Sequence, residues 1–275
     1  MPRISVLTIT GRMLYLKDQV ASLRSQTFQD FEWVIVDSNY LVNMQNVRNY
    51  VAYSFPLVHL QDREERVYFS ALTADNWGLV HCSGELVYFM MDYVLPHPNC
   101  LERHWEIYQK YKGVFISGRS YKINMTPDAF DSTMGMVGAQ DFRIGLERDK
   151  VEIEPDLFLI KNNLSTTWWA GRNDSAPLKA LLDCNGFEED LDGRWGGGDG
   201  EMANRLMTYG LLYLHDMKSF CLEFQHLTGD KKAIRSHDEQ LELASNLAKT
   251  KREQGIYKSN VKRDLWKERE KCLKQ

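Results

Sequence analysis

The chain is 275 residues long, enough for one large or two small α/β domains whose core needs no covalent cross-links. A formal net charge of −4 gives no overall attraction to nucleic acid. The five cysteines are scattered and include no CxxC pair, which argues against a disulfide framework or a zinc site and favours a reducing, intracellular compartment.

The first two predicted strands, Arg3–Ile9 and Phe31–Asp37, are short apolar runs rich in β-branched residues. Such runs are typical of strands buried on both faces of a parallel sheet. Between them, Tyr15–Gln26 places apolar residues at spacings of four and three, which predicts an amphipathic helix. Together the three segments predict a strand–helix–strand unit.

The same alternation continues toward residue 91. A third strand is predicted at Pro56–Leu60, a helix from about Val67 to Cys82, and a fourth strand at Leu86–Met91. Alternating strands and helices predict an α/β fold built on an open, mostly parallel sheet flanked by helices. In such sheets ligands bind at the carboxyl ends of the strands.

After Tyr111 the pattern is less regular. Residues 126–154 are polar and irregular, long enough for a functional lid or a disordered excursion. The elements predicted on either side of this segment are strands at Gly113–Ile123, Asp156–Ile160, Leu211–Asp216 and Ser219–Leu227, and helices at Ala176–Cys184 and Asp199–Gly210.

Residues 236–275 are charged and favour helix, and from Lys249 onward they are rich in Lys and Arg, which predicts a basic helical tail. The default expectation is an exposed helix, and the alternatives are contact with an anionic membrane surface or with a phosphate backbone. The chain has no run of about 18 apolar residues, and its N-terminus lacks the pattern of a signal peptide. We therefore expect a cytoplasmic protein without a transmembrane segment.

Polar side chains lie near the ends of the first two strands. Thr8, Thr10 and Arg12 follow from the first strand, and Asp37 ends the second. A carboxylate at the carboxyl end of a second parallel strand is able to accept hydrogen bonds from a ribose hydroxyl or a base N–H. The alternative is that Asp37 belongs only to a turn.

A second candidate position is Asp92, which follows an apolar strand and precedes Pro96. Asn76 and Gly78 lie in the helix before that strand, where a glycine allows close approach of another backbone or a ligand. One carboxylate at the ligand edge, together with the phosphates of a nucleotide, suits Mg²⁺ or Mn²⁺. The alternative is that Asp92 only caps the turn.

A third candidate position begins with the glycine cluster Gly196–Gly198, which follows Trp195 and leads into Asp199 and Glu201. The next residues favour helix, and a carboxylate in the first turn of a helix is stabilised by the helix dipole. That interaction would keep Asp199 ionised, as a general base must be. The alternative is a glycine loop followed by an ordinary helix cap.

Two blocks of the chain carry a family resemblance. The segments Ile4–Arg12, Leu23–Asn39 and Ala74–Glu102 are similar to a family-2 type glycosyltransferase of the GT-A fold, which is Rossmann-like. The segment Trp168–Gly210 resembles the acceptor-side block of galactosyltransferase-like members. The two blocks occur in the right order, and the resemblance covers roughly residues 3–227.

The resemblance implies a GT-A domain over residues 1–235, with a nucleotide-sugar half at 1–112 and an acceptor half at 113–235, followed by the helical tail at 236–275. It implies that Asp199 is the catalytic base. The residues implied to bind the donor are Thr8, Thr10, Arg12 and Asp37 around the base and ribose, Asn76 near the diphosphate, and Asp92 in the metal and diphosphate motif.

The residues expected to contact the acceptor are Trp168, Trp169, Trp195 and Glu201. An aromatic pair such as Trp168–Trp169 could form a platform under a sugar ring, and it is also typical of a hydrophobic core.

The resemblance further implies Mn²⁺ or Mg²⁺ held by Asp92 and a late histidine, His226, with His215 as the second candidate. The sequence departs from the family pattern here, because the family's Asp-x-Asp is Met91-Asp92-Tyr93 and the glutamate that follows Gly-Gly is Asp199 instead. A metal held mainly by phosphates and His226, or no metal, are the alternatives to a metal shared by several carboxylates.

The function implied is transfer of a sugar from a nucleotide-sugar, by family habit a UDP-sugar, to an acceptor hydroxyl with inversion. A glycan is the expected acceptor, and a hydroxylated nucleic-acid base is the alternative that the basic tail keeps open. Two other functions are a nucleotidyltransferase, for which the segment after the first strand offers only Gly11, and an inactive nucleotide- or glycan-binding module.

Overall fold

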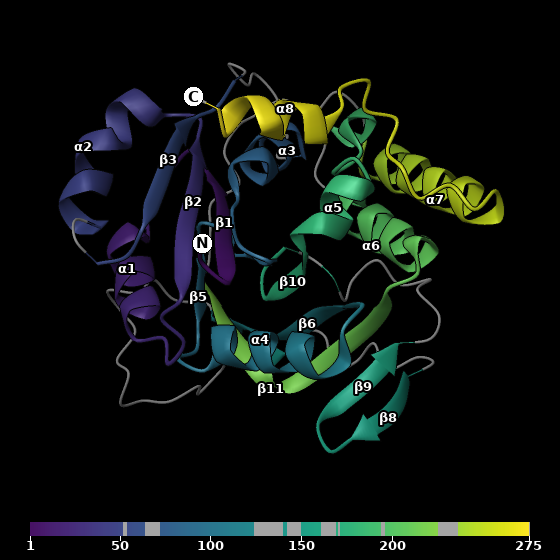
Figure 1. Cartoon of the computed structure of the whole chain (residues 1–275), viewed down its shortest axis with the longest axis horizontal. Helices are drawn as coiled ribbons and strands as arrows, with labels where there is room; N and C mark the ends of the chain where they lie inside the picture. The colour runs from purple at the N-terminus through teal and green to yellow at the C-terminus, as the bar shows by residue number, and fades with distance from the viewer. Residues whose placement is uncertain are drawn as a thin grey trace.

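The structure is a computed structural model that describes residues 1–51, 54–63, 72–123, 140–141, 150–160, 169, 171–193, 196–224 and 236–274. Within these residues the main path of one mixed sheet runs across Figure 1. Its strands, in spatial order, are β3 (Leu57–Gln61), β2 (Phe31–Asp37), β1 (Ile4–Thr10), β4 (Leu86–Phe89), β10 (Asp174–Pro177), β6 (Val114–Ile123), β11 (Leu212–Phe224), β9 (Leu157–Ile160) and β8 (Lys150–Glu154).

The first four strands of that order are parallel to one another, as their apolar runs predict. β1 lies between β2 and β4, and its last residue, Thr10, is paired with Asp37 at the end of β2. The carboxyl ends of both strands therefore meet at one edge of the sheet, where the predicted donor residues lie.

Helices cover both faces of this parallel half (Figure 1). On one face α1 (Leu16–Arg24) and α2 (Tyr40–Val51) pack with Ile35, and on the other α3 (Leu72–His81) packs with Val34. Adjacent residues of β2 thus point into different cores because side chains alternate along a strand. This double coverage explains why the strand is apolar throughout.

The second half of the sheet is mixed. β10 is antiparallel to both β4 and β6, whereas β6 and β11 are parallel. Two short strands complete it, β5 (Val94–Pro96) beside β11 and β7 (Gln140–Asp141) beside β6. The helices here are α4 (Cys100–Tyr111), α5 (Leu178–Asp183) and α6 (Gly198–Tyr209), with the short 3₁₀ helix η4 (Glu189–Leu191).

Some predicted elements differ from the observed ones. The two predicted closing strands form one strand, β11, whose register with β6 shifts between Asp216 and Phe220. The helix predicted from Ala176 begins at Leu178, because Ala176 and Pro177 pair with β4 as part of β10. The parallel arrangement is thus limited to the first four strands and the β6–β11 pair among the described residues.

The C-terminal segment folds back onto the molecule as α7 (His237–Glu253) and α8 (Leu265–Cys272), which lie beside α6 and α3 in Figure 1. Ser236 begins α7 with a capping box, in which its hydroxyl accepts from the Glu239 N–H and the Glu239 carboxylate accepts from the Ser236 N–H. Leu265 of α8 is fully buried, and Arg269 donates to the carbonyl of Cys82. The helices are therefore packed against the sheet domain rather than extended from it.

Candidate active site

Asp92 lies in the turn between β4 and β5, at the carboxyl edge of the parallel strands. Its Oδ2 accepts from Thr10 Oγ1 at 3.0 Å and from Arg12 Nε at 3.3 Å, and its Oδ1 accepts from Arg12 Nη2 at 2.9 Å. The Asp92 side chain is 8% exposed and that of Arg12 is 33% exposed. The edge thus carries a bidentate ion pair whose carboxylate is buried and whose guanidinium reaches the surface.

The turn after β1 directs Arg12 toward Asp92. The Thr10 hydroxyl accepts from the backbone N–H groups of Arg12 and Met13 at 3.2 and 3.3 Å. A hydroxyl that bonds backbone groups two and three residues ahead stabilises a turn. Because the same hydroxyl donates to Asp92, Thr10 fixes both the turn and the carboxylate.

Asp37 ends β2 as predicted and is fully buried. Its Oδ1 accepts from the Asn39 N–H at 2.8 Å and from Asn43 Nδ2 at 3.2 Å, and its Oδ2 lies 3.1 Å from His59 Nε2. Asn43 belongs to α2, a helix that the sequence pattern did not predict. The carboxylate is therefore held at the predicted donor edge by three elements. These are the turn after β2 (Asn39), α2 (Asn43) and β3 (His59).

Two other predicted donor residues are tied into the packing. Thr8 is buried and accepts from Trp33 Nε1 at 2.9 Å. Asn76 of α3 is also buried, accepts from the Phe187 N–H at 2.7 Å, and donates to the Phe187 carbonyl at 3.0 Å and to Glu189 at 2.9 Å. Asn76 therefore connects α3 to the segment that follows α5.

Gly171 connects the Asp92 turn with the start of α6. A Cβ placed on Gly171 would lie 3.1 Å from Met91 Cε and 3.5 Å from Asp199 Oδ1. Its φ of +67° lies in the left-handed region, which favours glycine. The side chains of Met91 and Asp199 therefore approach the same point, and Asp199 lies next to the turn that carries Asp92.

Arg172 follows this glycine and is buried among acidic groups. Its Nε lies 3.3 Å from Glu223 Oε2, and its side chain is 10% exposed. Burial lowers the pKa of Arg172, but Glu223, Tyr93 and Asp199 raise it more, so the net pKa is raised. Arg172 is thus a fixed positive charge that faces both β11 and the start of α6.

Tyr93 packs against the same group. Burial raises the pKa of its hydroxyl to about 12, and Arg172 opposes part of that rise. The protonated hydroxyl donates to Met91 Sδ at 2.8 Å. Met91 and Tyr93, which occupy the places of the family's paired carboxylates, thus contact each other.

Asp199 lies in the first turn of α6 and is partly exposed. Gly197, the residue before the helix, has φ +82°, which an L side chain rarely adopts. The N-terminal end of a helix stabilises negative charge because its N–H groups and dipole point there. The glycine loop therefore presents one carboxylate at the start of α6, as the sequence predicts.

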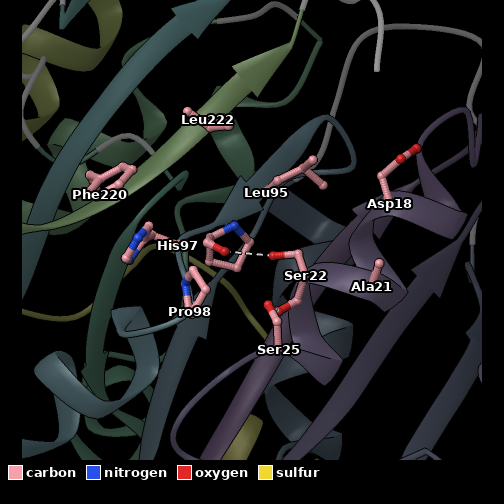
Figure 2. Close-up of a pocket in the computed structure, with 10 residues that line it drawn as sticks. Asp18, Ala21, Ser22, Ser25, Leu95, His97, Pro98, Phe220 and Leu222 are labelled. Atoms are coloured by element: carbon pink, nitrogen blue, oxygen red, sulfur yellow. Dashed lines mark hydrogen bonds between the residues drawn. The ribbon is translucent and has the colours of Figure 1, made fainter. Parts of the chain in front are cut away.

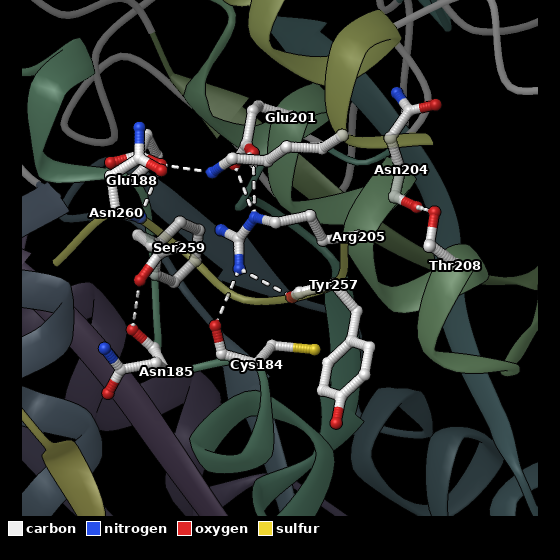
Figure 3. A network of polar contacts seen from close by, with 12 residues as sticks. Cys184, Asn185, Glu188, Glu201, Asn204, Arg205, Thr208, Tyr257, Ser259 and Asn260 are labelled. Carbon is white, nitrogen blue, oxygen red and sulfur yellow. Dashed lines mark hydrogen bonds and ion pairs between the residues drawn. The ribbon is translucent and has the colours of Figure 1, made fainter. Parts of the chain in front are cut away.

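Glu201, predicted to contact the acceptor, is fully buried in an ionic network instead of lying on the surface (Figure 3). Its two carboxylate oxygens accept from Arg205 Nε at 2.8 and 2.9 Å, and Lys251 Nζ of α7 lies 3.4 Å away. Lys251 also donates to Glu188, and Arg205 donates to the Cys184 carbonyl at 2.9 Å. Through these contacts Glu201 stabilises the packing of α6 against α7. Its predicted contact with an acceptor stays a prediction.

Helix α7 also supports the glycine loop directly. Gln240 Nε2 donates to the carbonyls of Leu191 and Gly196 at 2.9 and 2.8 Å. A Cβ on Gly197 would lie 2.4 Å from Ala244 Cβ, so the helix leaves no room for a side chain there. The C-terminal segment thus positions the loop from which Asp199 follows.

The remaining predicted site residues lie either in the hydrophobic core or outside the residues that the structure describes. Trp169 is 2% exposed and packs against Phe89 and Phe187 with ring centroids 5.4 and 6.2 Å away, which is the packing that the core alternative predicts. Trp168, Trp195 and His226 lie outside the described residues.

The described residues do not fit a divalent cation held by protein ligands. Within those ranges, no group of three or more His, Cys, Asp or Glu side chains converges. Both oxygens of Asp92 accept from Thr10 or Arg12, and the guanidinium charge opposes a second cation beside them. His215, the second histidine candidate, is 1% exposed and bonded to a serine of β6.

A separate cavity of about 350 Å³ lies between α1, β5 and β11 (Figure 2). One edge is closed by a hydrogen bond from Ser22 Oγ to the Pro96 carbonyl at 2.7 Å, and the rings of His97 and Phe220 lie 4.2 Å apart on the other. None of the predicted site residues lines it. The residues that do are Asp18, Ala21, Ser22, Ser25, Leu95, Pro96, His97, Pro98, Phe220 and Leu222.

Sequence reasoning missed the charged pair Arg172–Glu223. The signal available was an arginine directly after Gly171 and before Asn173 and Asp174, a polar run that follows the apolar Trp169. Nothing in the local pattern relates that arginine to a strand 51 positions later, because the pairing arises only from the sheet order.

The model of the family described as glycosyl transferase family 2 matches residues 6–171, more than half of the chain. No curated protein matches. Within the described residues, no helix is both long and apolar enough to span a membrane.

Several solved structures share the fold. S. aureus TarS 1-349 in complex with UDP superposes with a TM-score of 0.62 at 14% identity, over 95% of this chain and 67% of that one. GalNAc-T7 with UDP, GalNAc and Mn²⁺ superposes with a TM-score of 0.63 at 12% identity, over 90% of this chain and 48% of that one. The mannosyltransferase PcManGT from Pyrobaculum calidifontis with GDP-Man and Mn²⁺ superposes with a TM-score of 0.55 at 16% identity, over 83% of this chain and 58% of that one. At these identities the likeness establishes the α/β fold of GT-A glycosyltransferases.

Proposed function

The chain belongs to glycosyl transferase family 2 and is a glycosyltransferase, and on that premise we propose that it moves a sugar from a nucleotide-sugar to an acceptor hydroxyl, with Asp199 as the general base. The observation that carries the proposal is the position of Asp199 next to the Asp92 turn, across Gly171. A donor bound at the carboxyl edge of β1 and β2 would then have its sugar near a carboxylate at the start of α6.

The proposed donor is a UDP-sugar. Support comes from the solved structures of similar fold, since TarS is described in complex with UDP and with UDP-GlcNAc. PcManGT is described with GDP-Man, so a binding assay must compare a guanine nucleotide with the uracil nucleotide. Asp37, buried at the end of β2, is the group proposed to meet the base or ribose.

In the proposed reaction Asp199 accepts the proton of the acceptor hydroxyl as its oxygen bonds to the anomeric carbon. The bond from that carbon to the diphosphate oxygen breaks on the opposite face, and the nucleoside diphosphate leaves with the electron pair. Attack on the face opposite the leaving group inverts the configuration. The start of α6 and the charge of Arg172 both favour the ionised form that a base requires.

The acceptor is proposed to be a glycan hydroxyl that approaches from the side of α6. Trp168 and Trp195 are the proposed aromatic contacts, because a flat ring offers an apolar face to a sugar. Manganese occurs with two of the similar structures, and the pair that the sequence predicts for it is Asp92 with His226. The poor fit of the described residues makes metal dependence a quantity to measure rather than a premise of the mechanism.

The test is a panel of UDP- and GDP-sugars scored for slow hydrolysis of the donor, with either EDTA or Mn²⁺ present. Hydrolysis needs no acceptor, because water takes its place. Release of nucleoside diphosphate from one donor class would support the proposal and identify the nucleotide. An inactive binding module would bind a nucleotide without releasing it, and a chain that neither binds nor hydrolyses any donor would contradict the proposal.

A further inference from the structure

The ion pair between Arg12 and Asp92 is unlike the buried pair of α6, Arg205 with Glu201. Arg205, paired with Glu201, is 1% exposed, and each partner is enclosed by the protein. In the Arg12–Asp92 pair only the carboxylate is enclosed, while a third of the Arg12 side chain is exposed at the carboxyl edge of β1. The protein therefore fixes the position of a positive charge at the surface where a donor would lie.

The geometry of Asp92 favours this orientation over a metal ligand. One oxygen accepts from Nε and the other from Nη2 of Arg12, so the carboxylate fixes the plane of the guanidinium. The neighbours on either side, Met91 and Tyr93, carry no carboxylate that could share a cation with Asp92. A guanidinium has five N–H donors, so a group that bonds a carboxylate along one edge is able to bond phosphate oxygens along another.

We propose that Arg12, held in place by Asp92, binds the diphosphate of the donor and supplies the positive charge that a protein-held divalent cation would otherwise supply. The inference rests on the proposed function, since it takes a nucleotide-sugar as the ligand. It assigns Arg12 to the diphosphate rather than to the base and ribose, and it makes Asp92 the residue that positions Arg12. Binding of the nucleoside diphosphate then does not require added metal.

The experiment is calorimetric titration of the full chain with UDP and with GDP, in EDTA and again in Mn²⁺. The variants are Arg12→Gln, Arg12→Lys, and the double variant Arg12→Gln with Asp92→Asn. The double variant removes both charges of the pair, so no buried carboxylate is left unpaired if the single variant fails to fold. Arg3→Gln is the matched control, because Arg3 precedes the opposite end of the same strand and also forms ion pairs, with Glu85 and Asp30.

We expect the wild type to bind one of the two nucleotides equally well in EDTA and in Mn²⁺. Loss of a charged hydrogen-bond donor should weaken that binding about tenfold or more in Arg12→Gln and in the double variant. Arg12→Lys should recover part of the loss because it keeps the charge, and Arg3→Gln should bind like the wild type.

Two results would overturn the inference while leaving the proposed function intact. One is nucleotide binding that occurs only with Mn²⁺, and the other is a folded double variant that binds as tightly as the wild type. Absence of UDP and GDP binding in every condition is a different outcome, because it contradicts the proposed function itself.

Discussion

Asp92 and Asp199 occupy different surroundings, although Gly171 lies close to both Asp199 and Met91, the residue before Asp92. Asp92 is buried, and both of its oxygens accept hydrogen bonds from Thr10 or Arg12. Asp199 is partly exposed in the first turn of a helix. A carboxylate that is already bonded is suited to hold a neighbouring group, whereas one at an accessible helix start is suited to accept a proton. In the proposed mechanism Asp92 positions Arg12 and Asp199 accepts the proton.

The first prediction concerns Gly171, where a side chain would disturb this arrangement. In Gly171→Ala the new Cβ lies 3.1 Å from Met91 Cε at a φ of +67°, so the substitution costs about 1 kcal/mol of stability and shifts Met91 or Asp199. We expect a large loss of donor hydrolysis together with a modest fall in Tm.

The matched control is Gly210→Ala at the end of α6, where φ is +108° and a Cβ meets nothing within 4 Å. It should lower the Tm to a similar extent but leave the hydrolysis rate unchanged. Equal rates in Gly171→Ala and Gly210→Ala would show that the approach of Met91 and Asp199 at Gly171 does not matter for catalysis.

Helix α7 is the part of the C-terminal segment that packs against α6, the helix on which Asp199 lies. Lys251, 5% exposed at its side chain, lies between Glu188 and Glu201. Two buried carboxylates from different segments therefore share one ammonium group, and the arrangement holds α6 beside α7. Removing one partner of a buried ion pair is costly because the other charge stays buried without compensation.

We predict that Lys251→Met lowers the free energy of unfolding by about 3 kcal/mol, in the range typical of a broken buried ion pair. The control is Lys249→Met, an exposed position of the same helix, for which a change close to zero is expected. Urea unfolding of the two variants measures both values. Similar stabilities for Lys251→Met and the wild type would mean that the network does not hold α7 in place.

Helix α8 is tied to the domain by a carboxylate that makes stability depend on pH. Partial burial raises the pKa of Asp183, but three hydrogen bonds lower it more, so its net pKa lies below the ordinary value. The donors are Lys179, Tyr209 and Trp266 of α8. A lowered pKa in the folded state means a stabilising contribution that is complete above the unfolded-state pKa and is lost as pH falls through the folded-state pKa.

We therefore predict that Asp183→Asn is less stable than the wild type at neutral pH and that the difference shrinks below about pH 4. Thermal melts of the two proteins across an acid pH series measure it. A difference between the two proteins that stays constant down to the lowest pH would rule out this contribution of Asp183.

Much of the parallel half could be predicted because its elements are determined by their own patterns. β1 and β2 are apolar runs buried on both faces, and their observed ends lie within one residue of the predicted ones. β10 could not be predicted, because Asp-Ser-Ala-Pro contains no residue that favours strand, and its conformation comes from pairing with β4 and β6. Helices α2 and α4 were missed as well.

The candidate site, like the fold, could be predicted only in part. Thr10, Arg12, Asp92 and Asp199 could be selected by residue type and by their places at the ends of elements. Their pairing could not, because the bond between Arg12 and Asp92 joins residues 80 positions apart. The contact of Lys251 with Glu201 spans 50 positions and places a tail that was expected to be exposed against α6.

At the scale of the whole molecule, the described residues form two large cores on opposite faces of the sheet and a smaller one between α4, β6, β9 and β11. Leu265 of α8 belongs to the core on the α3 face, and α7 packs beside α6. Such packing leaves four of the five thiols inaccessible. Cys82, Cys100, Cys184 and Cys221 are buried, and only Cys272, on α8, is partly exposed. Burial raises the pKa of Cys100 to about 11 and that of Cys184 to about 12.

We predict that one thiol reacts with Ellman's reagent in the native protein at pH 8 and five react after denaturation. Cys272→Ser should abolish the native reaction. Rapid reaction of several thiols in the folded wild type would contradict the packing of α7 and α8 against the domain.

The measurement that tests the central claim most directly compares donor hydrolysis by the wild type and Asp199→Asn, with nucleotide binding measured on the same samples. Asp238→Asn, an exposed carboxylate in the first turn of α7, is the control. Loss of a general base predicts a rate lower by about a hundredfold or more in Asp199→Asn, with nucleotide affinity unchanged. A wild-type rate of hydrolysis in Asp199→Asn would contradict the assignment of Asp199 as the base.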